Sequence, residues 1–396
     1  MRIAHVITRM ILGGAQENTL LNCRDLIREY GDDVLLITGP ATGPEGSLME
    51  VVRTEAIPYQ QLDSLRRPIR PWRDLKAYAD IRRALAAFAP QVVHTHSAKG
   101  GMLGRFAAAS LEVPAIVHTV HGAPFYDHQR AAARWLYRLC ERRAAAKCHE
   151  LISVADAMTQ LMVAGGVAPQ SKFTTVYSGM EVSPFCDAER HRAITRSELG
   201  YADDEIVVGK IARLFQLKGH QYLLSAAREI VDACPQVRFL LVGDGNLREH
   251  YERQISRLGM TRFFKFTGLV PAARIPALVS AMDVLVHASL REGLARALPQ
   301  ALLARRPVIS FDIHGAREVV INGETGFLVQ PCQVDDLAKS AIELANNPSL
   351  RAAMGQRGQR LCKGRFDHLN MTGQVRAIYE RILEGRSDLP ERVSIR

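Results

Sequence analysis

A strand–loop–helix–strand pattern between Met282 and Phe311 constrains the fold of this chain more than any other feature. Met282–Ala288 is a short apolar run with β-branched residues, which is typical of a buried strand. Apolar residues at helical spacing follow, and a second buried strand is expected from Pro307. Two strands joined through a helix form a parallel crossover unit, so the pattern predicts an α/β domain with a parallel sheet.

The loop inside this unit carries a carboxylate. Pro299 is tolerated only in the first turn of a helix, because it lacks an N–H group and its ring clashes one turn back, so the helix is expected to start between Ala295 and Leu298. Glu292 then lies at the carboxyl end of a strand, where open α/β sheets bind ligands, and Gln300 lies in the first turns of the helix. Free N–H groups between them favour an anion, which suits a polyhydroxyl group carrying a phosphate. A solvated loop residue is the alternative for Glu292.

This segment resembles the E-x7-E signature of the family-4-type retaining glycosyltransferases of the GT-B architecture. It runs Glu292-Gly293-Leu294-Ala295-Arg296-Ala297-Leu298-Pro299-Gln300. In the family the first Glu contacts the transferred sugar and the second contacts the ribose hydroxyls. Here Gln300 replaces the second acid, and it can hydrogen-bond hydroxyls only without the charge assistance of a carboxylate. The resemblance implies two doubly wound, Rossmann-like α/β domains facing across a cleft, with Gly293, Leu294 and Ala295 beside the donor.

Two cations follow the strand expected at Ile206–Ile211. Arg213 and Lys218 lie five residues apart in the loop after this strand, with Gly219 next. Two cations at one strand end are costly to place together unless an anion lies between them, and a diphosphate is such an anion. The form G-[RK]-x-x-R-L-x-x-x-K-G is similar to the diphosphate-binding pair of the same family. Two solvated loop charges are the alternative.

Glycine-containing loops follow several other expected strands. Gly13 and Gly14 come after the first strand, Ile3–Thr8, and lie where relatives carry a GGA-[EQ] loop that faces the donor phosphates and the acceptor. The resemblance also places three residues of the second half at the nucleotide: Gly243, Gly268 and Val270.

Three histidines fall at or near strand ends, namely His94, His96 and His121. A metal site is conceivable, but their spacing matches no known ligand pattern, and we assign no metal ligand. The resemblance places His121 beside the reacting sugar. It also implies that no metal or other cofactor is needed, because cationic side chains replace a metal at the leaving diphosphate of a UDP- or GDP-sugar.

A basic amphipathic helix is expected between Gln129 and Lys147. Its arginines are four residues apart and share one face, while Trp135 and Leu136 lie on the other side. Such a helix can lie on an anionic membrane surface, and a solvated basic face over a packed apolar one is the alternative. The arginines are Arg130, Arg134, Arg138 and Arg142. A second basic segment, Leu65–Trp72, is broken by prolines and is interpreted as a surface loop. A solvated turn is the favoured interpretation, and contact with an anionic acceptor is the alternative.

Length and composition are those of a globular protein with two domains. The chain has 396 residues, of which 47% are hydrophobic and 23% charged. Its net charge of +10 favours anionic partners, and among them we expect a nucleotide sugar and not a nucleic acid. The odd number of cysteines, seven, favours a reducing compartment over a disulfide framework. Neither a signal peptide nor a membrane span is expected, which predicts a cytoplasmic protein that could associate with the inner face of the membrane.

The resemblance therefore implies a retaining hexosyltransferase that is independent of metal. We expect an acceptor-side domain at 1–182, completed by a C-terminal helix at about 370–385, a nucleotide-sugar domain at 183–369 and a loose tail at 386–396. Catalytic roles fall to His121, Arg213, Lys218 and Glu292. The acceptor would be a hydroxyl of a cell-envelope glycan or a lipid-linked saccharide.

Three other functions were weighed. A nucleotide-sugar epimerase shares the architecture but would need no acceptor, and the E-x7-E-like segment argues against it. A two-domain sugar-binding protein normally carries an export signal. An NAD-dependent dehydrogenase would need G-x-G-x-x-G after its first strand, which Gly13-Gly14-Ala15 does not supply.

Overall fold

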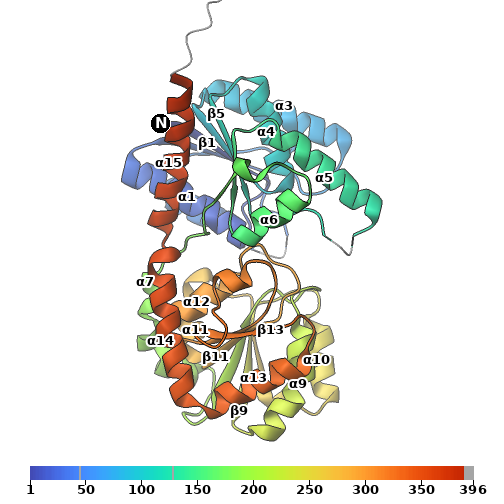
Figure 1. Cartoon of the computed structure of the whole chain (residues 1–396), viewed down its shortest axis with the longest axis vertical. Helices are drawn as coiled ribbons and strands as arrows, with labels where there is room; N and C mark the ends of the chain where they lie inside the picture. The colour runs from blue at the N-terminus through green and yellow to red at the C-terminus, as the bar shows by residue number, and fades with distance from the viewer. Residues whose placement is uncertain (44–45, 127–128, 388–396) are drawn as a thin grey trace, which may run out of the picture. The chain divides into compact units, whose positions relative to one another are not determined.

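The structure is a computed structural model that describes residues 1–43, 46–126 and 129–387. It divides into two compact units (Figure 1). The N-terminal unit comprises Met1–Met180 and the chain from His368 onward, and the C-terminal unit comprises Glu181–Asp367. Each unit has its own hydrophobic core, and the C-terminal helix contributes Met371, Val375 and Tyr379 to the core of the N-terminal unit.

The N-terminal unit contains a parallel sheet of seven strands in the order β3-β2-β1-β4-β5-β6-β7. β1 lies between β2 and β4, so the strand order reverses there, as in a doubly wound fold. The central strands are buried on both faces, which explains their nearly continuous apolar sequences. The strands are β1 (Arg2–Ile7), β2 (Asp33–Thr38), β3 (Tyr59–Gln61), β4 (Val92–His96), β5 (Ala115–Val120), β6 (Glu150–Ser153) and β7 (Phe173–Thr175).

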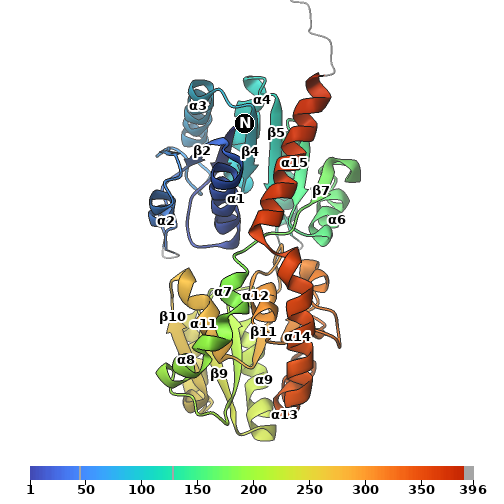
Figure 2. The same ribbon diagram turned by 90° about the vertical axis from the view of Figure 1, so that its left-hand side faces the viewer.

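Helices cover this sheet in layers. α3, α4 and α5 pack side by side, with α4 against β1, β4 and β5, while α1 packs against α15 (Figures 1 and 2). The helices are α1 (Gly14–Tyr30), α2 (Met49–Thr54), α3 (Pro71–Phe88), α4 (Ala98–Ser110), α5 (Ala131–Ala145), α6 (Asp156–Ala164) and α15 (His368–Ser387).

The C-terminal unit contains a second parallel sheet, in the order β10-β9-β8-β11-β12-β13. Its strands are β8 (Ile206–Ile211), β9 (Val237–Val242), β10 (Phe264–Gly268), β11 (Val284–His287), β12 (Val308–Phe311) and β13 (Gly326–Val329). Its helices are α7 (Ser183–Cys186), α8 (Arg192–Glu198), α9 (His220–Ala233), α10 (Arg248–Arg257), α11 (Ile275–Ala281), α12 (Ala297–Leu303), α13 (Val334–Asn346) and α14 (Pro348–Arg365). Short 3-10 turns lie at Gln170–Lys172, Ala188–His191, Thr261–Phe263, Ala272–Arg274 and His314–Glu318. The two parallel sheets confirm the predicted α/β fold class.

The segment that most constrained the fold is built as predicted. β11 is followed by a loop, by α12 and by β12, and β11 pairs in parallel with β12. Pro299 is the third residue of α12, where its missing N–H group leaves no intrahelical bond broken. Other boundaries differ from those expected. The turn Ser97–Gly101 predicts a helix that starts near Met102, but α4 begins at Ala98, because Ser97 at φ +61° turns the chain sharply after β4.

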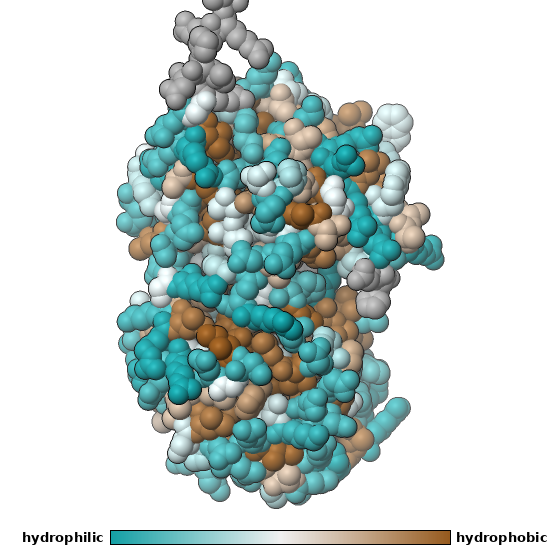
Figure 3. Space-filling view, in the orientation of Figure 1, coloured by the Kyte–Doolittle hydropathy of each residue, from teal (hydrophilic) through white to brown (hydrophobic). Residues whose placement is uncertain are grey.

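The predicted basic helix is shorter than expected. α5 begins at Ala131, so Arg130 is its N-cap residue and lies outside the helix. Trp135 and Leu136 do not pack inside: their exposed fractions are 64% and 52%. The guanidinium of Arg138 lies over the Phe125 ring, 5.2 Å from its centroid. In the view of Figure 3 the surface of this unit is mostly hydrophilic with separate hydrophobic residues. The alternative of a solvated basic face over a packed apolar one therefore does not hold at Trp135 and Leu136.

The C-terminal helix is longer than expected. α15 continues to Ser387, so the tail does not start at 386, and residues 388–396 lie outside the described residues. In the part of the chain that the structure describes, no helix has both the length and the hydropathy needed to cross a bilayer.

Candidate active site

The loops after β8, β9, β10 and β11 meet at the carboxyl edge of the C-terminal sheet. Backbone hydrogen bonds join them in pairs. The Leu290 N–H donates to the Leu217 carbonyl over 2.8 Å, and the Leu214 N–H donates to the Asp244 carbonyl over 2.9 Å. Because these bonds cross between loops of different strands, the loop that carries Lys218 is fixed against the loop that carries Glu292.

Lys218 and Glu292 form an ion pair at this edge. The Nζ atom of Lys218 donates to Oε1 of Glu292 over 2.6 Å, and both side chains are about one-fifth exposed, at 22% and 18%. His287, the last residue of β11, places Nε2 3.4 Å from the same oxygen. One carboxylate oxygen therefore faces a fixed cation and a ring nitrogen, while the site retains access to solvent.

The surroundings keep Glu292 ionised. Burial alone would raise the pKa of this carboxyl group, but the Lys218 ammonium and His287 outweigh burial and hold the pKa below its usual range. Burial lowers the pKa of His287 despite the neighbouring carboxylate, which favours a neutral imidazole. A carboxylate that stays charged at physiological pH accepts hydrogen bonds from hydroxyl groups.

A buried lysine lies beneath this pair. Lys210 of β8 is fully buried, and among the described residues its Nζ atom has no hydrogen-bond partner. Burial and, to a smaller extent, the charge on Lys218 lower the pKa of Lys210 to about 7, although the charge on Glu292 opposes both. Much of the population therefore carries a neutral amine at neutral pH. Sequence reasoning did not single out this residue, although a lysine within an apolar strand was a signal for it.

Gly219 allows the close approach that positions Lys218. It lies at φ +68° and precedes α9, and a Cβ atom added there would lie 1.7 Å from the carbonyl oxygen of Ala288. No other residue can occupy this position without moving the loop after β11, because the obstacle is backbone. Glycine at position 219 therefore lets the loop that carries Lys218 lie against the residues that follow β11.

The glycines predicted at the nucleotide lie on the adjacent strands. The Gly243 N–H donates to the Gly268 carbonyl over 3.1 Å, which joins the loops after β9 and β10. A Cβ atom on Gly243 would lie 2.4 Å from the Ala212 carbonyl oxygen. Val270 follows Gly268 and is half-buried. The structure thus brings Gly243 and Gly268 together at the same sheet edge as Lys218.

The remaining predicted donor residues flank Glu292. Gly293 is half-buried, Leu294 and Ala295 are buried, and Gln300 is half-buried in the first turns of α12. Arg213 is exposed, and its guanidinium lies 5.2 Å from the centroid of the Phe215 ring. Lys218 makes the direct contact with Glu292.

In the N-terminal unit, Gly13 and Gly14 lie at the carboxyl edge of the sheet. Gly13 is the N-cap residue of α1 and Gly14 its first residue. The Gly13 carbonyl accepts the N–H groups of Gln16 and Glu17, and the Gln16 side chain folds back over Gly13. The predicted turn between strand and helix is present, with the start of α1 directed at this edge.

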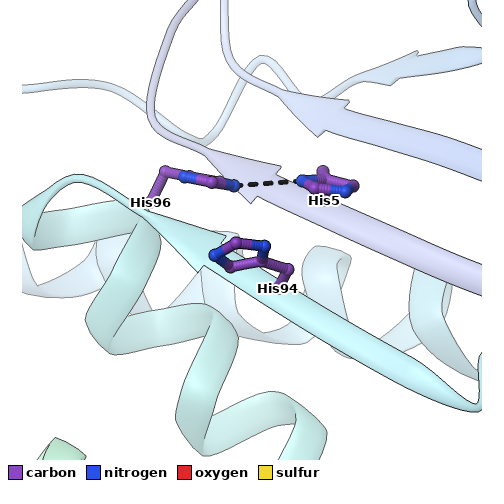
Figure 4. Close-up of side chains that lie close together, drawn as sticks. All are labelled: His5, His94 and His96. Atoms are coloured by element: carbon purple, nitrogen blue, oxygen red, sulfur yellow. Dashed lines mark hydrogen bonds between the residues drawn. The ribbon is translucent and has the colours of Figure 1, made fainter. Parts of the chain in front are cut away.

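Three histidines form a hydrogen-bonded chain that ends at His121. His5 Nδ1 lies 3.0 Å from His96 Nε2, and His96 Nδ1 lies 3.1 Å from His121 Nε2. His94 lies beside them (Figure 4), hydrogen-bonded to Tyr379 and Thr119. Burial lowers the pKa of His5 to about 3, and it lowers the pKa values of His94 and His96 well below the ordinary range. The three buried imidazoles are therefore neutral, and His96 fixes the ring of His121.

His5, His94 and His96 are also close enough to be considered as metal ligands, since one nitrogen from each lies within 4.8 Å of the others. However, both ring nitrogens of His94 and both of His96 already have partners within the protein. Of the six ring nitrogens of these three histidines, only His5 Nε2 is buried without a partner among the described residues. Three-fold coordination would break hydrogen bonds in the dry interior, so the arrangement fits a polar network better than a metal centre. His5 was missed in the sequence, where it lies within the apolar first strand.

Comparisons with known proteins cover both units. A sequence model of the family described as "Glycosyl transferases group 1" matches residues 191–361, and one described as "Glycosyl transferase 4-like domain" matches residues 13–179. The chain is 27% identical over 383 residues to the UDP-Gal:alpha-D-GlcNAc-diphosphoundecaprenol alpha-1,3-galactosyltransferase of Escherichia coli, with 96% of each protein covered. The chain belongs to the family-4-type glycosyltransferases of the GT-B architecture.

Other relatives agree with this assignment. The glycosyltransferase is 32% identical over 177 residues to the 2-deoxystreptamine glucosyltransferase of Streptomyces kanamyceticus, with 45% of this chain and 46% of the relative covered. Among solved structures, Anabaena HepE in complex with UDP and glucose matches with a TM-score of 0.82 at 23% identity, and the match covers 96% of this chain and 100% of HepE. At that identity the likeness shows the fold.

Proposed function

We propose that this glycosyltransferase moves a hexose-type sugar from a UDP- or GDP-sugar to a hydroxyl group of a cell-envelope glycan or a lipid-linked saccharide. The observation that carries the proposal is the ion pair between Lys218 and Glu292 at the carboxyl edge of the C-terminal sheet. A cation for a diphosphate and a carboxylate for a sugar hydroxyl are thereby held side by side. The acceptor class is supported by the E. coli relative, whose name specifies a diphosphoundecaprenol-linked acceptor.

In this proposal different residues at the edge of the C-terminal sheet contact different parts of the donor. Lys218 and Arg213 bind the diphosphate and stabilise the charge that develops on it as the glycosidic bond breaks. Glu292 accepts a hydrogen bond from the sugar, Gln300 contacts the ribose, and the backbone at Gly243, Gly268 and Val270 borders the base. Lys218 is held by Glu292 before the donor arrives, so the donor meets a cation whose position is already fixed.

The transfer is proposed to retain the anomeric configuration. The bond between the anomeric carbon and the diphosphate oxygen breaks, and the acceptor oxygen bonds to that carbon on the same face. The acceptor hydroxyl proton passes to the leaving phosphate oxygen, so no carboxylate pair of the glycosidase kind is required. Side-chain cations take the place of a metal at the diphosphate, and His121 is proposed to lie beside the reacting sugar with Gly13 and Gly14 at the acceptor side.

A screen of nucleotide sugars tests the proposal. Each donor is incubated with and without lipid-diphosphate acceptors, and released nucleoside diphosphate is measured. Release that requires both a donor and an acceptor supports transfer, and NMR of the anomeric proton reports whether configuration is retained. Conversion of the donor sugar without any acceptor would instead identify an epimerase.

The arginines near α5 are proposed as a secondary membrane contact. Arg130, at the start of α5, and Arg142, within it, are exposed. Trp135 and Leu136 of the same helix are exposed as well. Basic and aromatic side chains together favour an anionic bilayer surface.

A further inference from the structure

The N-terminal unit contains a basic hollow to which the transfer reaction described above assigns no role. Its volume is about 350 Å³, which is within the usual range of about 300–1,000 Å³ for ligand sites. No acidic residue is among the described residues that line it. We call it the arginine pocket, after Arg9, Arg66, Arg67, Arg70 and Arg73, which line it together with Thr42 and two prolines.

Four of the five arginines of this pocket, Arg66, Arg67, Arg70 and Arg73, form no ion pair with a described carboxylate. Elsewhere in the same unit arginines meet carboxylates: Arg105 lies 2.8 Å from Glu141, and Arg381 lies 2.6 Å from Glu150. Within the described residues, no ion pair joins a carboxylate to any of the four guanidinium groups contributed by the segment between β3 and α3 and by the first turn of α3. Like charges around one hollow repel each other, and a bound polyanion would remove that cost.

The walls of the pocket are held in place by contacts outside it. Lys99 of α4 donates to the Pro68 carbonyl over 2.5 Å and to Oδ1 of Asp74 over 2.6 Å. The other carboxylate oxygen of Asp74 accepts the Arg70 N–H over 3.0 Å. On the opposite wall Arg9 donates to the Thr42 carbonyl over 2.8 Å. The Asp74 carboxylate is thus used to fix the backbone, and the arginine side chains line the hollow.

Large apolar side chains alternate with these arginines. Ile69, Trp72 and Leu75 are spaced by three residues and are exposed to 68%, 86% and 61%. Trp72 and Leu75 both lie on α3, where a spacing of three residues brings side chains to the same face. A tryptophan with neighbouring arginines is typical of the boundary between a bilayer and water, where the ring enters the headgroup region.

The arginine pocket lies at the same sheet edge as the proposed acceptor side. Arg9 follows β1, Thr42 follows β2 and the arginine-rich segment follows β3, all at the carboxyl ends of parallel strands. His121 follows β5 at that edge. From β2 to β5 there are three strand spacings, or about 14 Å. An anion in the pocket would leave that distance for the sugars between it and the reacting hydroxyl.

We propose that the arginine pocket binds the phosphate or diphosphate group of a lipid-linked saccharide acceptor, and that Ile69, Trp72 and Leu75 contact the hydrocarbon boundary from which the lipid emerges. This inference rests on the proposed function, because it specifies how that reaction's acceptor is held. A phospholipid headgroup and free pyrophosphate have the same anionic chemistry as the phosphate of a lipid-linked acceptor. The test below therefore distinguishes these three ligands.

Vesicle co-sedimentation provides the test. Phosphatidylcholine vesicles are doped either with geranylgeranyl diphosphate or with phosphatidylglycerol at the same surface charge. The wild-type protein is expected to bind the diphosphate vesicles at least tenfold more tightly. Arg67→Ala/Arg73→Ala should weaken that binding by about 30-fold, since each basic residue near a membrane surface contributes about a fivefold factor. The matched control is Arg82→Ala/Arg83→Ala, which removes two exposed arginines of α3 outside the pocket and should leave binding unchanged.

A second variant tests the apolar contact. Trp72→Ala should weaken binding to the diphosphate vesicles about tenfold and leave binding of free pyrophosphate, measured by calorimetry, unchanged. Equal binding of the wild type to both vesicle types would overturn the acceptor assignment, because the pocket would then respond to charge alone. Equal binding of the pocket variant and its control would overturn the pocket itself. Loss of pyrophosphate binding in Trp72→Ala would overturn the membrane role of the tryptophan.

Donor binding keeps this test separate from the proposed function. Arg67→Ala/Arg73→Ala should bind UDP as the wild type does, and circular dichroism checks that it is folded. If the wild type binds diphosphate vesicles but releases no nucleoside diphosphate from any donor, the proposed function fails while the lipid site stands. If transfer to a lipid-linked acceptor is unchanged in the pocket variant, the inference fails while the proposed function stands.

Discussion

The Nζ atom of Lys218 lies 2.6 Å from Oε1 of Glu292, although the two residues are 74 positions apart in the chain. Three features produce this contact: the carboxyl ends of β8 and β11 are adjacent, a hydrogen bond joins the loops that follow them, and Gly219 lets the first loop pass against the backbone of the second. The ion pair is therefore a consequence of the sheet topology, and we expect its disruption to weaken donor binding.

Gly219→Ala should destabilise the C-terminal unit by on the order of 3 kcal/mol or more, because the added Cβ would clash with backbone. Gly259→Ala is a matched control. Its φ of +66° is nearly that of Gly219 at +68°, but an added Cβ would meet nothing within 4 Å, so it should lose only about 1 kcal/mol. Denaturant unfolding of both variants measures the difference. Equal losses of unfolding free energy in the two variants would show that the close approach of Gly219 to Ala288 does not contribute to stability.

Lys210→Met should stabilise the protein near neutral pH by about 2–4 kcal/mol, since it removes a buried amine that lacks a partner among the described residues. The pKa of Lys210 is 10.5 in the unfolded chain and about 7 in the folded protein. The unfolded state therefore binds more protons between these values, and wild-type stability should rise with pH across that window.

The pH dependence of Lys210→Met is the sharper observation. Its unfolding free energy should vary less between about pH 7 and about pH 10 than that of the wild type. Lys339→Met, at an exposed position of α13, should leave the wild-type slope unchanged. A variant with the same slope as the wild type would show that Lys210 does not titrate in this range.

Gln300→Glu should tighten UDP binding by about fivefold, because a carboxylate makes a stronger hydrogen bond to a ribose hydroxyl than an amide does. Gln300→Leu, which has a similar volume but no polar atoms, should weaken UDP binding. Calorimetry with UDP measures both. Affinities that do not change in either variant would remove Gln300 from the ribose site.

His96→Ala should lower turnover by about 10- to 100-fold and leave donor KM unchanged, because His121 loses the partner that fixes its ring. His94→Ala is the control for the loss of a buried imidazole. His94 bonds Tyr379 and Thr119 and not His121, so this variant should lose stability without a matching loss of turnover. Equal losses of turnover in both would reduce the role of His96 to packing.

The parts of the fold that the sequence predicted are those with strong local patterns. The apolar runs of β1, β8 and β11 matched their observed positions closely, and Pro299 correctly limited the start of α12. β3 was not predicted, because Tyr59–Gln61 is three exposed residues without apolar alternation and forms a strand only by pairing with β2. The sequence also left open whether Trp135 on α5 is exposed, because a helical stripe does not reveal which side is covered.

The site shows the same division. The neighbourhood of Lys218 and Glu292 followed from parallel topology, which gathers the carboxyl ends of strands at one edge. The buried partners could not be placed in that way. Lys210 and His5 lie in apolar strands, and only the packed structure shows that Lys210 reaches the electrostatic surroundings of Glu292 and that His5 leads through His96 to His121.

The binding of UDP to Lys218→Ala, measured by calorimetry beside Lys339→Ala as an exposed-lysine control, tests the central claim most directly. A folded Lys218→Ala is expected to bind UDP about 10- to 100-fold more weakly and to lose turnover, since it lacks the proposed charged partner of the diphosphate, while Lys339→Ala behaves as the wild type. Wild-type affinity and turnover in a folded Lys218→Ala would contradict the account.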